Sequence, residues 1–113
     1  MELLINKNES EGDIQLSIMD SYGRAFCMLN YYENEKHAMF FSNFCVNEDN
    51  RSCGLGGIMI NEVMKYSKEL GCEYLYLEVV VSDKWIYDWY KRLGFVEYKN
   101  NGDRISMFKK LNK

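Results

Sequence analysis

Residues 44–57, FCVNEDNRSCGLGG, decide the fold of this chain. An apolar strand end runs into a polar loop, and the loop closes with glycines at positions 54, 56 and 57, where a helical pattern begins. Glycine lets backbone N–H groups turn toward one point without a Cβ atom in the way, and a helix N-terminus adds partial positive charge. The segment therefore predicts an anion site suited to a diphosphate, with Arg51 at its mouth. A glycine turn that only packs a helix on a sheet is the alternative.

The hydrophobic period changes on the two sides of this loop. Before it, alternating residues predict an antiparallel meander of strands at 14–20, 25–33 and 38–46, after a short strand at 2–6. In strand 38–46 the alternation puts Phe40, Ser42, Phe44 and Val46 on one face. After the loop, the pattern predicts a helix at 55–70, a strand at 73–81, a helix between Asp83 and Gly94, and a hairpin of strands 95–99 and 104–111.

Strands 38–46 and 73–81 should lie parallel, because a crossover helix joins them. The expected fold class is α/β of the α+β type: a mixed, mostly antiparallel sheet with one central parallel pair, flanked by helices. A length of 113 residues fits a single domain over residues 1–113.

Composition excludes several classes of protein. The chain has 14 basic and 17 acidic residues, a net charge of −3, which argues against nucleic-acid binding. No apolar run approaches the ~18 residues of a membrane span, and the N-terminus does not look like a signal peptide. Four cysteines without a C-x-x-C pair, together with one histidine, predict reduced thiols and no metal site. We therefore expect a cytoplasmic protein that binds neither nucleic acid nor membrane.

Two known phosphate loops do not fit the glycine segment. A Walker loop ends in G-K-[ST], and this chain has Gly57-Ile58 after Gly56. A dinucleotide fingerprint needs a third glycine where Met59 stands. What remains is R-x-x-G-x-G, from Arg51 to Gly56.

This motif resembles the pyrophosphate loop of the GNAT superfamily of N-acetyltransferases. The rest of the family pattern follows at similar spacing: Leu77-Glu78-Val79, then Asp83, then Tyr90 and the ending Leu93-Gly94-Phe95. The resemblance covers about residues 14–111 and is strongest over 44–95. It implies a GNAT fold and an enzyme that uses acetyl-CoA, without a metal, to acetylate a primary amine of a small molecule, a protein N-terminus or a lysine. The amine would attack directly in a ternary complex.

The resemblance also implies a set of site residues. Tyr90 would donate a proton or hydrogen bond to the departing thiolate; the alternative is a core aromatic on the apolar stripe formed by Trp85, Ile86, Trp89, Tyr90 and Leu93. Glu78 would be the general base, as in similar enzymes that acetylate the N-terminal alanines of ribosomal proteins; the alternative is a carboxylate at a sheet edge or paired with a lysine. A backbone N–H near Val46 would stabilise the oxyanion. The expected acetyl-CoA contacts are Phe44, Cys45, Val46, Arg51, Ser52, Cys53, Gly54, Leu55, Gly56, Gly57, Asp83 and Tyr90.

Departures from the family pattern concern mainly the acceptor. Cys53 replaces a common Lys or Arg, and Asp83 replaces a common Asn. Only about 13 residues precede Ile14, enough for a short strand and none of the helices that usually form one wall of the acceptor pocket. We therefore expect an open acceptor site, or one completed by a partner chain in a homodimer. Residues 1–50 carry nine acids and three bases, which would suit a cationic amine. A non-catalytic CoA-binding or regulatory module is the alternative function.

Overall fold

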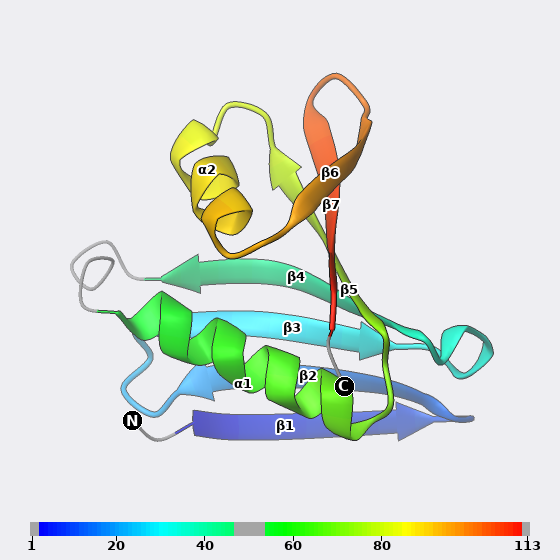
Figure 1. Cartoon of the computed structure of the whole chain (residues 1–113). Coiled ribbons are helices and arrows are strands. Elements are labelled where there is room, and N and C mark those ends of the chain that lie inside the picture. The colour runs from blue at the N-terminus through cyan, green and yellow to red at the C-terminus, as the bar shows by residue number, and fades with distance from the viewer. Residues whose placement is uncertain (1–2, 47–53, 112–113) are drawn as a thin grey trace.

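The computed structural model describes residues 3–46 and 54–111 (Figure 1). They form one seven-stranded sheet in the order β1-β2-β3-β4-β5-β7-β6, with two α-helices. The elements are β1 (Leu3–Ser10), β2 (Asp13–Asp20), β3 (Ala25–Tyr31), the short 3₁₀ turn η1 (Glu33–Glu35), β4 (Ala38–Val46), α1 (Leu55–Glu69), β5 (Tyr74–Val80), α2 (Lys84–Arg92), β6 (Val96–Asn100) and β7 (Arg104–Lys110). No helix within the described ranges is long and apolar enough to cross a membrane.

Strand directions agree with the sequence. The β4–β5 pair is parallel, and the other five neighbouring pairs are antiparallel. The predicted α+β fold with one central parallel pair is therefore confirmed. Two boundaries differ: β3 ends at Tyr31 because η1 follows, and β1 runs to Ser10 because it pairs along the whole of β2.

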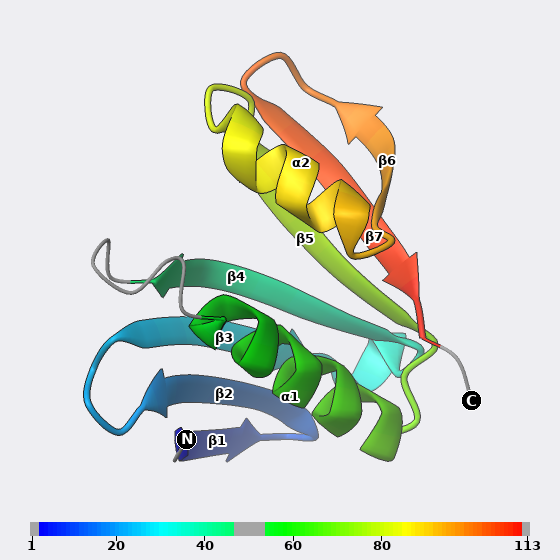
Figure 2. The same ribbon diagram turned by 60° about the vertical axis from the view of Figure 1, so that its left-hand side comes forward.

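Both helices cover the same face of the twisted sheet, α1 over β2 to β4 and α2 over β5 and β7 (Figures 1 and 2). In β3 the alternation is strict: Ala25, Cys27, Leu29 and Tyr31 are buried, and the residues between them are not. The helical spacing of α1 turns Leu55, Met59, Ile60 and Val63 onto this face. One continuous apolar core thus fills the space between the sheet and its two helices.

The opposite face carries no α-helix among the described residues. The reason lies in the first connection: β1 joins β2 through Glu11 and Gly12 alone. Both residues have positive φ angles, 52° and 90°, as a tight two-residue hairpin requires. The chain therefore has no helix between its first two strands, where the family usually has one or two.

Strand β4 contains a β-bulge that changes one prediction. Phe26 pairs with Cys45 and Met28 pairs with Ser42, so two residues of β4 stand opposite Cys27 alone. The extra residue turns Phe44 to the side of Phe41, and their ring centroids are 5.4 Å apart. The predicted alternation, with Phe40 and Phe44 on one face, is therefore wrong beyond Ser42.

Candidate functional site

The site begins where β4 and β5 separate. The two strands are paired at only three positions, Ala38 with Tyr74, Met39 with Leu75 and Phe40 with Tyr76. Beyond Phe40 and Tyr76 they diverge, and Figure 2 shows the wide fork between them. β5 turns instead to β7, with which it pairs along its whole length. A fork of this kind leaves backbone groups on both arms open to a ligand.

A cleft of about 820 Å³ occupies the helix side of the open end of this fork. Its walls come from β4, the start of α1, and α2 with the residue before it. The lining residues are Phe44, Cys45, Gly54, Gly56, Gly57, Asp83, Trp85, Ile86, Trp89 and Arg92. The structure thus brings together six residues that the sequence assigned to cofactor binding.

The first turn of α1 forms one end of the cleft. Gly54 is the N-cap residue with a φ of 82°, a left-handed conformation that suits glycine, and no side chain of the described residues caps the helix. The first helical hydrogen bond runs from Ile58 N to the Gly54 carbonyl, so the N–H groups before it have no helical partner. These groups and the helix dipole favour an anion at this end of the cleft.

Two stacked rings form the middle wall. Phe44 and Trp89 lie parallel, with centroids 5.8 Å apart and an interplanar angle of 4°. A Cβ atom on Gly56 would stand 3.3 Å from the Phe44 ring and 3.6 Å from Trp89. The bulge in β4 therefore turns the Phe44 ring toward α1, and the absence of a side chain at Gly56 leaves room for this ring.

Tyr90 lies on the helix side, but beneath the surface of the cleft. Its side chain is 3% exposed, and its ring contacts Trp89 and Phe95 at centroid distances of 5.2 and 5.4 Å. Burial raises the pKa of Tyr90 above its usual value, and the Cys27 thiol on β3 adds to the shift. At neutral pH the phenol therefore keeps its proton and can donate a hydrogen bond.

Glu78 lies on the other face of the sheet. Its side chain is 53% exposed, and its Oε1 lies 4.0 Å from Nη1 of Arg104 on β7. β5 is an interior strand, so the edge-strand alternative does not apply; the paired alternative is realised with an arginine instead of a lysine. Glu78 and Tyr90 thus stand on opposite sides of the fork.

Helix α2 supplies residues to the cleft that the sequence did not assign to it. From the sequence, Trp85, Ile86 and Trp89 were only members of an apolar stripe, and Arg92 had no role. In the structure all four line the cleft, and Trp85 is 55% exposed. The sequence feature that could have indicated this is the width of the apolar stripe. Five apolar positions in nine residues are more than one packed helix face needs, so some of them are free to line a cleft.

The remaining predicted site residues have different placements. Asp83 is the N-cap residue of α2, but its side chain makes no capping bond and its carbonyl accepts from Ile86 and Tyr87 instead. Leu55 is 3% exposed and packs in the core. Val46 ends β4. Arg51, Ser52 and Cys53 lie outside the described residues.

Comparisons with known proteins agree with this geometry. The profile of the family described as "Acetyltransferase (GNAT) family" matches residues 21–95. No curated protein sequence matches the chain. Many solved structures share the fold.

Three of these structures illustrate the likeness. A Klebsiella pneumoniae protein assigned as an acyl-CoA N-acyltransferase has a TM-score of 0.75 at 17% identity, over 93% of this chain and 77% of its own. The ribosomal-protein-S18-alanine N-acetyltransferase of Escherichia coli has a TM-score of 0.73 at 19% identity, over 93% and 73%. Ard1 from Thermoplasma volcanium has a TM-score of 0.74 at 18% identity, over 88% and 71%. At these identities the likeness is one of fold.

Proposed function

The chain belongs to the acetyltransferase (GNAT) family, and on that premise we propose that it transfers an acetyl group from acetyl-CoA to a primary amine. The observation that carries the proposal is the coincidence of three features at one place. These are the fork between β4 and β5, the start of α1 with glycine as its N-cap residue, and the cleft that joins them.

The cleft fits coenzyme A in size and in chemistry. A volume of about 820 Å³ lies within the range of sites for large cofactors. Phosphate groups would be held by the first N–H groups of α1, with Arg92 at the opposite wall as the cation. Phe44 and Trp89 offer apolar surface to the remainder. When bound, acetyl-CoA supplies a reactive thioester, and the protein's residues supply the proton transfers.

The amine nitrogen forms a bond to the acetyl carbon while the carbon–sulfur bond breaks. Glu78 accepts the proton that the amine must lose, and Tyr90 donates to the sulfur as negative charge develops there. A backbone N–H near the bulge in β4 donates to the carbonyl oxygen. Because Glu78 and Tyr90 stand on opposite sides of the fork, base and donor would act from opposite sides of a thioester between the strands.

A non-catalytic CoA-binding or regulatory module is the alternative function. One observation favours it: Tyr90 is buried, and the cleft-lining residues do not include it. Binding without turnover is what the alternative predicts.

Thiol release separates the two functions. We expect the chain to bind coenzyme A, seen as a rise in Tm, and to release thiol from acetyl-CoA when primary amines are supplied. Arg92→Gln should weaken binding without unfolding the protein, because this side chain is exposed at the cleft wall. Lys91→Gln, an exposed neighbour on the same helix, is the matched control. A rise in Tm without thiol release on any amine would support the regulatory module.

A further inference from the structure

The helix-free face of the sheet carries a group of aromatic side chains that the proposed cofactor site does not use. We call this group the aromatic face. Its members are Tyr32, Phe40, Tyr74, Tyr76, Tyr98 and Phe108. Each ring lies within 6.1 Å, centroid to centroid, of at least one other. Tyr32 is 39% exposed and Tyr98 is 54% exposed, so solvent reaches the group.

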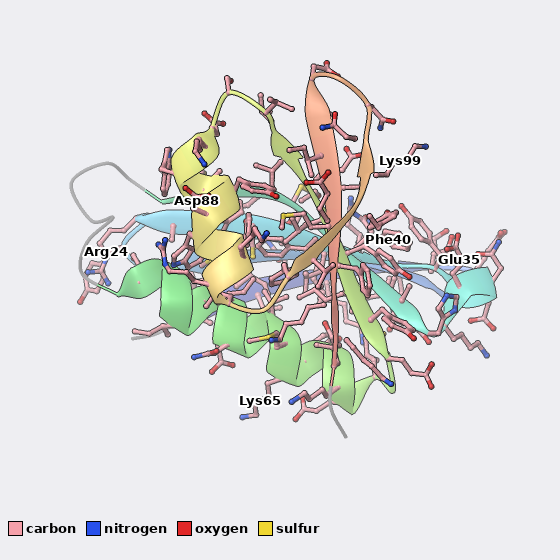
Figure 3. All side chains as sticks on the ribbon, turned by 45° about the horizontal axis from the view of Figure 1, so that its top comes forward. Arg24, Glu35, Phe40, Lys65, Asp88 and Lys99 are labelled. Carbon is pink, nitrogen blue, oxygen red and sulfur yellow. The ribbon has the colours of Figure 1, made fainter. Side chains whose placement is uncertain are left out.

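The aromatic face lies at the closed end of the fork. Phe40 and Tyr76 are the last registered pair of β4 and β5 before the strands diverge, and their rings stack with centroids 5.5 Å apart. Figure 3 shows Phe40 and Glu35 at the end of the molecule where η1 leads into β4. This pair of rings therefore lies at the point where the two arms of the fork meet.

Carboxylates accompany the rings on this face. Glu78 follows Tyr76 by two positions on β5, so both side chains leave the sheet on the same side. Burial raises the pKa of Tyr76, and the neighbouring phenols and the Glu35 carboxylate add to the shift. The cations that β7 adds to this side are Arg104, beside Glu78, and Lys110, opposite Tyr74. The rings nearest the fork thus have acidic groups at two margins.

We propose that the aromatic face binds the acceptor, and that the acceptor is a cationic alkylamine. This inference rests on the proposed function and names its substrate class. Ring faces attract an ammonium group, and the hydrocarbon stem of the amine packs on the same rings. Glu35 and Glu78 add attraction for a cation and repel an anion. The bound ammonium group first loses one proton to solvent. The free amine then forms a bond to the acetyl carbon while the carbon–sulfur bond breaks, Glu78 accepts the second proton from the nitrogen, and Tyr90 donates to the departing sulfur.

A series of amines with the same carbon chain tests the charge preference. Cadaverine, n-pentylamine and δ-aminovalerate end in an ammonium, a methyl and a carboxylate group. We expect kcat/KM to fall in that order, with δ-aminovalerate at least about tenfold below n-pentylamine. Equal or better use of δ-aminovalerate would overturn the proposal.

Substitution of the rings tests the site. Tyr76→Leu should raise the KM for n-pentylamine about tenfold, while kcat and the KM for acetyl-CoA stay near those of the native chain. Tyr22→Leu, on an 81% exposed tyrosine of the β2–β3 turn, is the matched control and should change none of these values. If Tyr76→Leu does not fold, Tyr98→Leu replaces it, since this ring is exposed and should raise the KM about threefold. An unchanged KM in the folded variant contradicts the inference.

A binding measurement keeps this inference separate from the proposed function. The NMR lines of n-pentylammonium should broaden on the CoA-saturated native chain and not on the Tyr76→Leu variant. If this happens without any turnover, the aromatic face binds cationic amines and the proposed activity is wrong. If amines turn over but neither KM nor line width depends on the rings, the activity stands and the aromatic face is not the acceptor site.

Discussion

Tyr90 is the residue on which the proposed chemistry depends most. Removing its hydroxyl group leaves the ring contacts with Trp89 and Phe95 in place. Tyr90→Phe should therefore keep the fold and the KM for acetyl-CoA, and lower kcat by about 10²-fold, because the thiolate loses its donor. Steady-state kinetics with n-pentylamine measures both values.

The matched control for this variant lies on the same helix. The hydroxyl of Tyr87 donates to Oε1 of Glu97 at 3.0 Å, on the exposed side of α2. Tyr87→Phe removes a phenolic hydroxyl without approaching the cleft, so kcat should not change. Equal kcat for the native chain and Tyr90→Phe would exclude Tyr90 as the donor.

The buried thiol of Cys27 should make the stability of the fold decrease at alkaline pH. Burial raises the pKa of this thiol from 9.0 to about 12, with a smaller effect from Cys45. A raised pKa in the folded chain means that the thiol's contribution to stability is complete below pH 9 and is lost as the pH rises toward 12. Cys27→Ala should lower Tm at neutral pH through the lost packing, but its Tm should then fall less steeply over this alkaline window.

The control for the alkaline experiment is Cys45, which is exposed. Cys45→Ala removes a thiol of the neighbouring strand without opening a core cavity. Its Tm should fall with pH almost as that of the native chain does. Identical alkaline slopes for all three proteins, measured by circular dichroism, would show that the buried thiol does not titrate on unfolding.

At the scale of elements, the start of α1 offers two glycines in different surroundings. A Cβ atom on Gly57 would meet no heavy atom within 4 Å, whereas one on Gly56 would press against the Phe44 ring. Gly57→Ala should therefore raise the free energy of unfolding by about 0.5–1 kcal/mol, as alanine favours the helix. In Gly56→Ala the crowding should cancel this gain, for a difference of about 1 kcal/mol between the two variants. Urea denaturation gives both values, and equal stabilisation would contradict the packing described for Phe44.

The elements themselves could be predicted from the sequence because each has a clear period. Alternation marks the strands, helical spacing marks α1 and α2, and a turn residue ends most of them. No such period marks the opening of the fork. It depends on where β4 stops pairing with β5 and on the bulge opposite Cys27, and both are set by contacts between strands. The same bulge explains why the face of Phe44 was predicted wrongly.

The residues of the candidate site also fall into two groups, those that a sequence motif could place and those that depend on contacts between elements. The glycines of α1 and Asp83 could be placed from a motif, because their spacing follows the chain. The cleft walls from α2 could not, because the exposure of Trp85 and Trp89 depends on how far α2 stands from β4. The aromatic face could not be predicted from the sequence either, because its rings come from different strands, β4, β5, β6 and β7, and meet only in the folded sheet.

At the scale of the molecule, the short β1–β2 connection explains why the face of the sheet beside Glu78 carries no helix in the described residues. Two residues, Glu11 and Gly12, replace the helices that the family usually has there, so the face beside Glu78 lacks that wall in the described chain. The homodimer expected from the sequence remains a prediction. The two edges of the sheet indicate which surface would form it.

The edge strands differ in how well they are protected against pairing. β6 is five residues long and has an irregular register between Glu97 and Lys99. β1 is eight residues long with a regular register, and Leu4 and Ile5 are half exposed. A long, regular edge with exposed apolar side chains favours antiparallel pairing with a second copy. We therefore expect any self-association to use β1, which would leave both forks open because β1 lies three strands away from β4.

Charge placed on each edge in turn tests this expectation. Ile5 on β1 and Val96 on β6 are 54% and 53% exposed, so we expect a lysine to reach solvent equally well at both positions. Multi-angle light scattering should give a dimer for the native chain and for Val96→Lys, and a monomer for Ile5→Lys, because this change replaces one of the exposed apolar side chains of β1 with an unpaired charge that opposes pairing. If only Val96→Lys dissociates the dimer, the interface lies at β6 and not at β1. If the native chain stays monomeric at all concentrations, no dimer forms. A β1 dimer would add no residue to the fork, so Ile5→Lys should keep the kcat and KM of the native chain. If this variant instead dissociates and loses activity, a partner chain would supply the missing wall of the acceptor site.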